Sequence, residues 1–473
     1  MKLGSITYRA KWLLVSAVVL SSVLGLARSI HADQIPSGWE ALNMRPVGYS
    51  GLEGRGGAFK MAIKQVNGHW YLFLGHLWNR GWSIVDVTQP EDPKYLKFVP
   101  GPDNTWTIQV DFHDNLLLTG LQDFYVPWGF DPKKPVEEGI LFWDISDPIN
   151  WKPLSHWKTG VKPGCGWVGS NCPNPIPTGN TTGTHRNGYP GGKYAFAAAY
   201  QPGFKGLILV ILDVSDPKNP KEAGKWWMPG QKDGEQLAPD TPPGTGFHGP
   251  AIIEGTRAYL GYGSKLVILD IADVASPKLI GQLSFGPPFV AGRTGVHDAF
   301  PIPGRDLLFV HSEGLGGDVI GQAKACEGPL DLAAMVDIHD PQKPRMISTF
   351  PLPIPPKDSP YKNFCDKPGR FGPHNISLEY HLPDVQKQAD LIYLTYFNAG
   401  LRVFNIKDPR LPVETAWFIP PTPTKRMGPI PEGPLVTETE DVLADTRGYI
   451  YITDKQWGLW ILRHTGKDAI PPQ

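Results

Sequence analysis

The sequence lacks any strong imbalance of charge. Its 45 lysine and arginine residues nearly match its 46 aspartate and glutamate residues, so the formal net charge is −1 with histidine neutral. It also lacks any long basic run. Nucleic-acid-binding proteins normally carry clustered positive charge. We therefore expect no nucleic acid among the partners of this protein.

Motifs that identify several large classes of enzymes and binding proteins are also missing. The sequence contains no G-x-S-x-G, no glycine-rich phosphate-binding loop, no H-E-x-x-H and no EF-hand pattern. Each of these motifs carries a defined chemistry. Their absence argues against the common serine hydrolases, nucleotide-binding folds, zinc proteases and EF-hand calcium sensors.

Cysteine is scarce, with only Cys165, Cys172, Cys326 and Cys365, and no C-x-x-C motif occurs. An even number of cysteines in an exported protein suggests disulfides. Cys165 and Cys172 lie in one insertion and could close a small loop there. Cys326 and Cys365 flank the fifth repeat and could link two of its insertions. A thiolate metal site or nucleophile is the less favoured alternative.

Long apolar runs are absent except near the N-terminus. Basic residues precede an apolar run at residues 12–26, and an imperfect small-residue cleavage site ends at Ala32. The run is shorter than the ~20 residues that span a bilayer, although a retained membrane anchor is the alternative. We expect residues 1–32 to be a signal peptide. Residues 33–473 would then be periplasmic or secreted, with no membrane contact after cleavage.

What the sequence has in abundance is turns. It contains 53 glycines and 50 prolines, yet 41% of its residues are hydrophobic and 11% are aromatic. Such apolar content is too high for a disordered chain. Many short strands separated by turns explain this composition better, and almost no segment has a helical pattern.

A short apolar segment followed by a turn recurs along the chain. Its clearest copy is residues 206–220, GLILVILDVSDPKNP, in which an aliphatic run precedes Asp213. Such a run bounded by turn residues predicts a buried strand. Further copies, the last one truncated, begin at Gly81, Gly139, Lys265, Leu332, Gly400 and Gly458.

The spacing of these copies predicts the fold. Asp86, Asp144, Asp213, Asp270, Asp337 and Asn405 share one position and are 58, 69, 57, 67 and 68 residues apart. Each interval has room for four strands, and repetition on this scale indicates a propeller or a solenoid. We predict an all-β, seven-bladed β-propeller formed by residues 33–473 as one domain. An open solenoid or two sandwiches are the alternatives.

The two ends of the chain predict how the propeller closes. Residues 61–74 supply two strands with no repeat strand before them, and the copy at Gly458 supplies a repeat strand with nothing after it. Together they would complete one blade and leave no unpaired edge. The aspartate of each repeat is expected to cap its turn.

Four histidines occupy one position of the repeat, before the third strand that follows each insertion. They are His185 in GTHRN, His248 in GFHGP, His297 in GVHDA and His374 in GPHNI. Equivalent positions in a propeller are related by rotation about its axis, so these imidazoles should converge. Imidazole is the commonest metal ligand and suits copper, iron and zinc. The alternative is that they are structural residues of the repeat.

The same position in the last repeat falls within residues 438–441, TETED being the local sequence. We choose Glu440 over Glu438 as the catalytic residue. It could be a fifth ligand, a partner that orients an imidazole, or a general base. Asp298, next to His297, could be a partner of an imidazole, and Glu313 could face the same side. His76 and His311 are expected to have packing roles.

Long insertions precede the histidine or glutamate position. They cover residues 160–184, 229–247, 350–373 and 420–439. We expect them to form a lid over the histidines, lined by Trp167, Phe247, Phe289, Tyr361, Phe364 and Phe371. A covered apolar pocket above a polar centre is typical of a small-molecule site.

The repeat, seen in ILVILDVSDPKNP and KLVILDIADVASP, resembles the LVIVD repeat of exported bacterial proteins over nearly all of residues 33–473. That group is distantly similar to the selenium-binding proteins, which include copper-dependent methanethiol oxidases. This resemblance implies a histidine-bound redox metal and matches the four histidines only by residue type and blade position. The cysteine motifs of that family are missing, which argues against thiol oxidation. Carotenoid-cleaving dioxygenases offer a structural analogy only: their propeller also holds iron with four histidines.

The leading hypothesis is therefore an exported metalloenzyme, an oxidase or oxygenase that acts on a small organic substrate. Its cofactor would be a transition metal, copper or iron being favoured and zinc being possible. A metal-dependent hydrolase or lactonase is the second hypothesis, although zinc sites usually have three protein ligands. A binding propeller without catalysis is the third.

Overall fold

The computed structural model describes residues 33–124, 126–165, 181–236, 246–286, 295–314, 326, 332–428 and 435–473. Contacts divide the chain into Met1–His31 and Ala32–Gln473, and all described residues belong to the second unit. These residues form strands and two short 3-10 turns, η1 (Leu52–Gly54) and η2 (Val126–Trp128). No helix in this part of the chain has the length and apolar character needed to cross a membrane.

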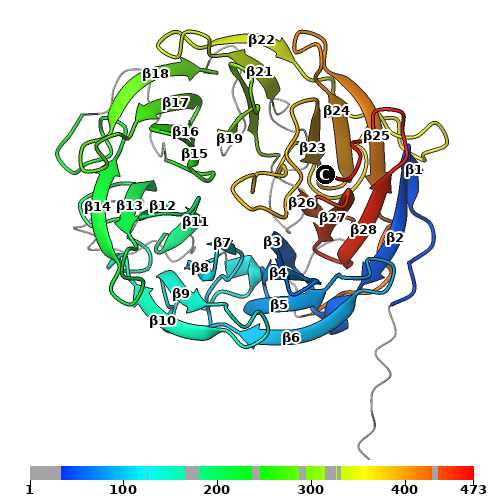
Figure 1. The fold of residues 1–473 in the computed structure, drawn as a ribbon, viewed down its shortest axis with the longest axis horizontal. Coiled ribbons are helices and arrows are strands. Elements are labelled where there is room, and N and C mark those ends of the chain that lie inside the picture. Colours follow the sequence, from blue (N-terminus) through cyan, green and yellow to red (C-terminus); the bar gives the residue numbers. More distant parts are fainter. Residues whose placement is uncertain are drawn as a thin grey trace, which may run out of the picture. The chain divides into compact units, whose positions relative to one another are not determined.

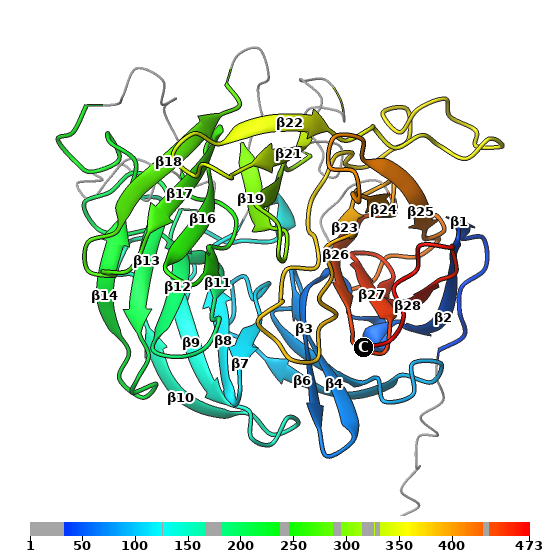
Figure 2. The same ribbon diagram turned by 45° about the horizontal axis from the view of Figure 1, so that its top comes forward.

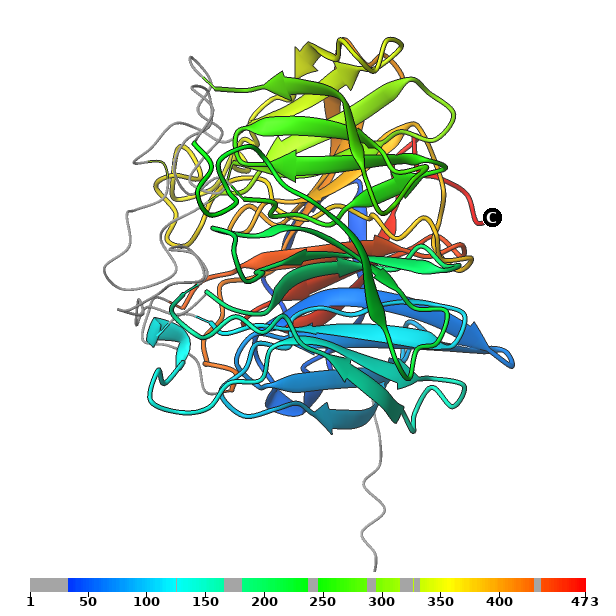
Figure 3. The ribbon, with the colours of Figure 1, turned by 90° about the vertical axis from the view of Figure 1, so that its left-hand side faces the viewer.

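The described strands form seven four-stranded antiparallel sheets arranged around a central axis (Figure 1). The structure is a seven-bladed β-propeller, as the repeats predict. One strand of each sheet lies nearest the axis, and Figure 2 shows β3, β7, β11 and β19 in this inner ring. Seen from the side, the strands run roughly along the axis (Figure 3).

Five sheets each take their strands from one continuous segment, in order from the axis outward. The first two contain β3 (Ala58–Val66), β4 (His69–His76), β5 (Gly81–Asp86) and β6 (Lys94–Pro100), then β7 (Asp111–His113), β8 (Leu116–Leu121), β9 (Gly139–Asp144) and β10 (Lys152–Trp157). The next two contain β11 (Thr184–Gly188), β12 (Tyr194–Ala199), β13 (Ile208–Asp213) and β14 (Lys221–Trp226), then β15 (Ile252–Glu254), β16 (Arg257–Tyr262), β17 (Lys265–Asp270) and β18 (Lys278–Ser284). The fifth contains β19 (Val296–Pro301), β20 (Leu307–Ser312), β21 (Ala333–Asp337) and β22 (Arg345–Thr349).

The last two sheets combine both ends of the chain. One contains β23 (Leu391–Thr395), β24 (Leu401–Asn405) and β25 (Val413–Ile419) with β1 (Glu40–Leu42) outermost. The other contains β26 (Thr439–Ala444), β27 (Tyr449–Asp454) and β28 (Gly458–His464) with β2 (Met44–Ser50) outermost. Pairing of the N-terminal strand β2 with the C-terminal strand β28 closes the ring as predicted, although a second blade also takes an N-terminal strand, β1.

The N-terminal strand of that closing blade is, however, not the predicted one. Residues 61–74 lie in β3 and β4, which pair with β5 and β6 in a sheet of their own. The closing strand β2 contains Pro46 and Gly48 and has no apolar run. An outermost strand tolerates proline because it pairs on one side only. At Gly48 a Cβ atom would lie 1.9 Å from the carbonyl oxygen of Pro90, so only glycine fits there.

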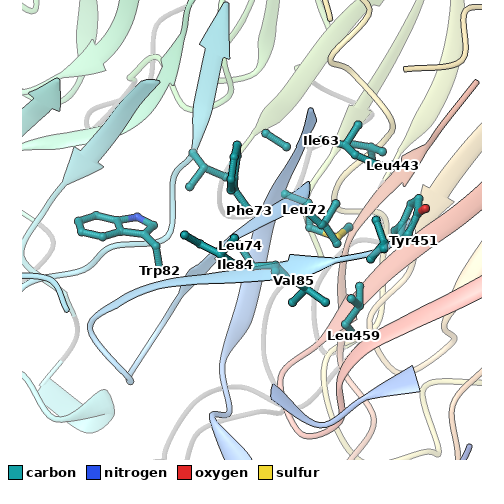
Figure 4. Close-up of a cluster of buried hydrophobic side chains, with 14 of the residues drawn as sticks. Ile63, Leu72, Phe73, Leu74, Trp82, Ile84, Val85, Leu443, Tyr451 and Leu459 are labelled. Atoms are coloured by element: carbon teal, nitrogen blue, oxygen red, sulfur yellow. The ribbon is translucent and has the colours of Figure 1, made fainter. Parts of the chain in front are cut away.

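The apolar segment of each repeat forms a strand that is buried on both faces. In β13, Leu209, Val210, Ile211 and Leu212 are all 0% exposed, because a neighbouring sheet covers each face. A run of successive apolar residues is typical of such strands. The largest contact cluster lies partly between the sheet of β3–β6 and the closing sheet, where Ile63 and Leu72 approach Leu443 and Tyr451 (Figure 4).

The acidic or amide residue that ends each repeat strand caps the following turn. The Oδ1 atom of Asp86 accepts a hydrogen bond from the backbone N–H of Thr88 at 2.8 Å, and Asp213 and Asn405 accept the equivalent bonds at 3.0 Å. Asp144, Asp270 and Asp337 do the same. The predicted structural role of this position is therefore observed in six repeats.

Cys326 and Cys365 form a disulfide, as predicted from their positions around the fifth repeat. Cys165 is buried. The predicted partner of Cys165, Cys172, lies outside the described residues. A disulfide is compatible with an exported protein.

Candidate metal centre

Three of the candidate residues lie at β-bulges in inner strands. The pairing of β11 with β12 shifts between Thr184 and Arg186, so that His185 has no partner in the ladder. His297 and Glu440 occupy the same place in the pairing of β19 with β20 and of β26 with β27. A bulge changes the direction of a side chain and is frequent beside functional sites. The repeat position found in the sequence is therefore a bulge position.

The other two histidines lie beside isolated bridges rather than within a regular ladder. His248 follows Phe247, which bridges Tyr262, and comes before β15. The backbone N–H of His374 donates to the carbonyl oxygen of Thr395 at 2.9 Å, just before the bridge of Ile376 with Leu394. The structure thus places all four histidines at the inner edges of consecutive blades, within or just before the inner strand.

Glycines allow neighbouring inner strands to approach each other closely at this centre. A Cβ atom on Gly249 would lie 1.8 Å from the carbonyl oxygen of His297. A Cβ atom on Gly261 of β16 would lie 2.6 Å from the same oxygen. Real Cβ atoms do not come this close to backbone oxygens, so these glycines set the separation of the two blades.

The four imidazole rings form a row around the axis. The ring centroids are 4.4 Å apart for His185 and His248, 4.9 Å for His248 and His297, and 5.1 Å for His297 and His374. His297 and His374 are 0% and 2% exposed, whereas the side chain of His248 is 20% exposed. The centre is therefore reached from the side of His248.

Glu313, which follows β20, places its carboxylate among three of these rings. Its Oε2 atom lies 3.6 Å from Nε2 of His248 and 3.8 Å from Nε2 of His297, and its Oε1 atom lies 3.8 Å from Nε2 of His374. Two ligands about 2.1 Å from one ion are at most about 4.2 Å apart. All three distances fall within this limit.

The ligand atoms of His248, His297 and Glu313 lie within 4.8 Å of one another, and they form one group that could hold a metal ion. His185 is not in this group, although its ring contacts that of His248. A second group consists of His297, Asp298 and His311. The group thus contains two of the predicted histidines and Glu313; His374 is not in it, although its Nε2 atom lies 3.8 Å from Oε1 of Glu313.

Hydrogen-bond acceptors lie behind three of the imidazoles. The Nδ1 atom of His185 lies 2.8 Å from Oε1 of Gln122, and that of His297 lies 3.1 Å from Oδ2 of Asp298. The Nδ1 atom of His374 lies 2.9 Å from the carbonyl oxygen and 3.0 Å from Oε2 of Glu440. An acceptor at Nδ1 requires the proton there and leaves Nε2 with its lone pair; that of His297 accepts a hydrogen bond from Nη2 of Arg186 at 3.0 Å.

Glu440 is the carboxylate behind His374 and does not lie among the rings. It is 0% exposed, and Nζ of Lys455 lies 2.8 Å from its Oε1 atom. Glu438 faces away from this histidine, since its Oε1 atom accepts the backbone N–H of Arg370 at 2.6 Å. Of the three roles considered for Glu440, its contacts favour that of a residue that orients an imidazole.

Burial gives these groups the protonation states that a cation site needs. Desolvation lowers the pKa of His248 to about 3 and that of His297 to about 4, and it also lowers the pKa of His374. Burial alone would raise the pKa of Glu313, but Arg370 and the surrounding imidazoles hold that pKa well below its usual range. At neutral pH the imidazoles are therefore neutral and the carboxylate is ionised.

Among the described residues, the aromatic side chains that contact the imidazoles are not those predicted from the insertions. Trp167 and Phe289 lie outside the described residues. Phe247, Phe364 and Phe371 are 0%, 1% and 6% exposed because they pack into hydrophobic clusters of the blades. Tyr361 packs beside Phe364. Instead, the rings that contact the imidazoles are Phe59, Trp106 and Phe397, at centroid distances of 5.4, 6.4 and 4.7 Å.

Sequence reasoning gave Glu313 only a minor role and did not find Gln122, Arg186, Arg370 or Lys455. Their residue types do not recur at the equivalent positions of other blades, so periodicity cannot reveal them; Arg186, for example, stands where Asp298 and Asp441 stand in their blades. Asp298 was considered as a partner of an imidazole because it follows His297, and the structure places it against that ring. His311, expected only to pack, also contacts Asp298 at 3.1 Å.

Comparison with known proteins addresses the repeat and the fold. Residues 191–226 and 252–284 match the LVIVD repeat model. These two stretches are LVIVD repeats. They contain β12–β14 and β15–β18, so the family resemblance is supported in these two blades. The predicted relation to selenium-binding proteins is not shown by any comparison, and no curated protein matches the chain.

Solved structures with the same fold are distant in sequence. The β-propeller domain of Cps50 (Swd1) from Myceliophteria thermophila is 10% identical, with a TM-score of 0.49, and the match covers 86% of this chain and 96% of that one. The periplasmic gluconolactonase PpgL of Pseudomonas aeruginosa is 10% identical, with a TM-score of 0.49 and coverages of 84% and 97%. A protein from Lactobacillus plantarum is 12% identical, with a TM-score of 0.44 and coverages of 88% and 96%. Similarity at this level carries no argument about function.

Proposed function

We propose that this protein is an exported, metal-dependent oxidoreductase that acts on a small organic substrate. Its metal ligands are His248, His297 and Glu313, which already lie within reach of one ion, and His374, which has to move closer to join them; His185 lies on the more open side of the centre. The observation that carries this proposal is the placement of one ionised carboxylate within 3.8 Å of three Nε2 atoms. The disulfide between Cys326 and Cys365 supports export to an oxidising compartment.

The donor set narrows the choice of metal. Four histidines alone suit copper or iron, whereas a carboxylate among the histidines resembles the ligand sets of non-haem iron(II) oxygenases. Iron(II) is therefore the first choice, copper the second, and zinc the third. When bound, the metal supplies an open coordination position and the capacity to activate O2 or to oxidise a bound molecule.

The residues around the ligands hold them in place and control their charge. Asp298 and Glu440 orient the rings of His297 and His374 through Nδ1. Arg370 pairs with the Oε1 atom of Glu313 and leaves Oε2 on the side of His248 and His297. The low exposure of the rings excludes bulk water, which strengthens every electrostatic interaction in the centre.

A metal-dependent hydrolase or lactonase is a second candidate. His248, His297 and Glu313 form a two-histidine, one-glutamate set, which is also the ligand set of several zinc hydrolases. Four histidine ligands argue against a catalytic zinc site, which usually has three protein ligands. This three-residue set does not. In that case the metal would act as a Lewis acid and no redox change would occur.

Metal analysis of protein produced without an affinity tag separates these candidates. We expect about one equivalent of iron or copper per chain, and less than about a tenth of that in His297→Ala and Glu313→Gln. His69→Ala, in which the replaced side chain is 57% exposed, is the matched control and should keep its metal. One equivalent of zinc or calcium would support the hydrolase. A protein that binds none of these metals would contradict both enzymes and leave a binding propeller.

A further inference from the structure

A buried arginine lies beside the imidazole cluster without a carboxylate partner. Arg186 follows His185 in β11 and is 2% exposed. One of its nitrogens, Nη2, donates to Oδ1 of Asn375 at 3.0 Å and lies 3.0 Å from Nε2 of His297. Its guanidinium carbon lies 5.8 Å from the centre of the ring of Phe59. This side chain therefore reaches the inner face of the centre.

The charge of Arg186 is not neutralised by direct contact. Among the described residues, its Nε and Nη1 atoms have no hydrogen-bond partner, and no carboxylate forms an ion pair with it. The other cations of the centre differ in this respect. Arg370 pairs with Glu313, Lys455 with Glu438 and Glu440, and Lys60 with Glu379 and Asp441. A buried, unpaired charge is costly to fold, so a role outside folding has to explain Arg186.

A cation bound at the imidazoles would make this imbalance larger. It would lie next to Nε2 of His297, the atom that Nη2 of Arg186 approaches to 3.0 Å. Two positive groups this close repel each other strongly in a poorly solvated site. Glu313 supplies one negative charge, but it also neutralises Arg370, and the carboxylate of Asp298 lies on the Nδ1 side of His297 rather than beside Arg186. An anion bound between the metal and Arg186 would relieve this repulsion.

We propose that Arg186 binds an anionic group, and that the substrate of the proposed enzyme is a small organic acid whose carboxylate is held between Arg186 and the metal. A guanidinium donates charge-assisted hydrogen bonds to carboxylates. Because Nη2 is engaged with Asn375 and His297, the Nε and Nη1 groups, which lack partners, each supply a single N–H donor to the anion. The part of this inference that involves the metal rests on the proposed function. The anion site does not, because Arg186 is buried and has free donors whether or not a metal is bound.

The test uses formate as the probe, measured by calorimetry on the full chain after metal removal and again after reloading with iron(II). We expect the wild type to bind formate in both states, more tightly when loaded. Arg186→Met should weaken binding by about tenfold or more in each state, because a hydrogen bond to a charged group is lost. Arg186→Lys should be intermediate, since it keeps the charge without the Nε and Nη1 donors. Arg45→Met, which removes an arginine from the exposed part of β2, should bind as the wild type does.

The outcomes separate this inference from the metal assignment. Formate binding that depends on Arg186 in a protein that takes up no metal supports the anion site and contradicts the metalloenzyme. A protein that loads metal but binds formate equally well in the wild type and in the Arg186→Met variant contradicts the inference alone. Failure of the wild type to bind formate in either state also overturns it. Thermal unfolding of both Arg186 variants, expected to match the wild type within a few degrees, verifies that they fold.

Discussion

Oε2 of Glu440 lies 3.0 Å from Nδ1 of His374, and this carboxylate is the link between the proposed ligands and a buried ionic network. Its other oxygen contacts Lys455, which in turn contacts Glu438 at 3.2 Å. Burial alone would raise the pKa of Glu440, but Lys455 and His374 lower it to about 2. Glu440 therefore remains ionised beside Nδ1 of His374, which also lies 2.9 Å from the backbone carbonyl oxygen of Glu440, its hydrogen-bond partner.

Replacing Glu440 should weaken metal binding without removing a ligand. We expect Glu440→Gln to lower the metal affinity about 10- to 100-fold, as the loss of partners behind metal-bound imidazoles generally does. Competition with a chelator measures this change. Glu222→Gln, on the outer strand β14, is the control and should have no effect. Equal affinities for Glu440→Gln and the wild type would show that His374 does not depend on this carboxylate.

The sequence predicts the positions of the four histidines because they follow a periodic pattern. The glycine and the small residues around His185, His248, His297 and His374 recur at the same place in each repeat, and a repeat position is also a position relative to the axis. Glu313 has no such pattern, since its side chain reaches the rings from the end of β20 in one blade only. Its position among the imidazoles depends on how side chains of different blades pack together, and the repeat pattern carries no information about that packing.

The closing blade shows a second limit of sequence reasoning. The repeat strand β28 is recognisable by its apolar run, but its partner β2 is an outermost strand with Met44, Pro46 and Gly48 and a burial pattern unlike that of the repeat. β2 pairs with β28 because it is the strand left without another partner when the ring of blades closes. The number of blades could therefore be predicted, and the identity of the closing strand could not.

Glycine at position 261 should be essential for the spacing of two blades. In Gly261→Ala the new Cβ atom would lie 2.5 Å from the carbonyl oxygen of Val296 and 2.6 Å from that of His297. We expect the substitution to lower the free energy of unfolding by about 1–3 kcal/mol, as overpacking does. It should also weaken metal binding, because relief of this clash moves β19, and His297 with it, away from the other proposed ligands.

Gly188→Ala is the matched control for this experiment. Gly188 lies in the inner strand β11, and a Cβ atom there would meet the carbonyl oxygen of Ala251 at 3.5 Å, an ordinary contact. Denaturant unfolding and chelator competition on both variants measure the two effects. If both alanine variants behaved alike, close approach of the blades at Gly261 would not be what sets the geometry of the centre.

The disulfide between Cys326 and Cys365 should stabilise the fold, because it closes a loop with a sequence separation of 39 residues. The chain-entropy relation gives about 4 kcal/mol as an upper figure for a loop of this length, and measured values are commonly about 2–4 kcal/mol. We expect the Cys326→Ser, Cys365→Ser double variant to lose that amount in denaturant unfolding. A reducing agent should bring the wild type towards the variant. No difference between them would mean that the blades hold these segments without the covalent link.

His76 should contribute a dependence of stability on pH. It is 0% exposed, its Nε2 atom lies 2.7 Å from Oγ of Ser83, and desolvation lowers its pKa to about 4. An unfolded histidine titrates near about 6.5, so between this pH and the folded value the unfolded chain binds the extra proton. The stability that His76 contributes is therefore complete above the unfolded value and is lost as the pH falls towards about 4, up to about 3 kcal/mol in total.

This dependence is separated from that of the other buried histidines by comparing variants. The free energy of unfolding, measured at pH 7.5 and again near the folded pKa of His76, should fall less in His76→Gln than in the wild type, because glutamine does not titrate. His69→Gln, which removes a side chain that is 57% exposed, should retain the wild-type fall. Identical falls in His76→Gln and the wild type would show that His76 binds its proton equally in the folded and unfolded states, which its complete burial against Gly56 and Ser83 argues against.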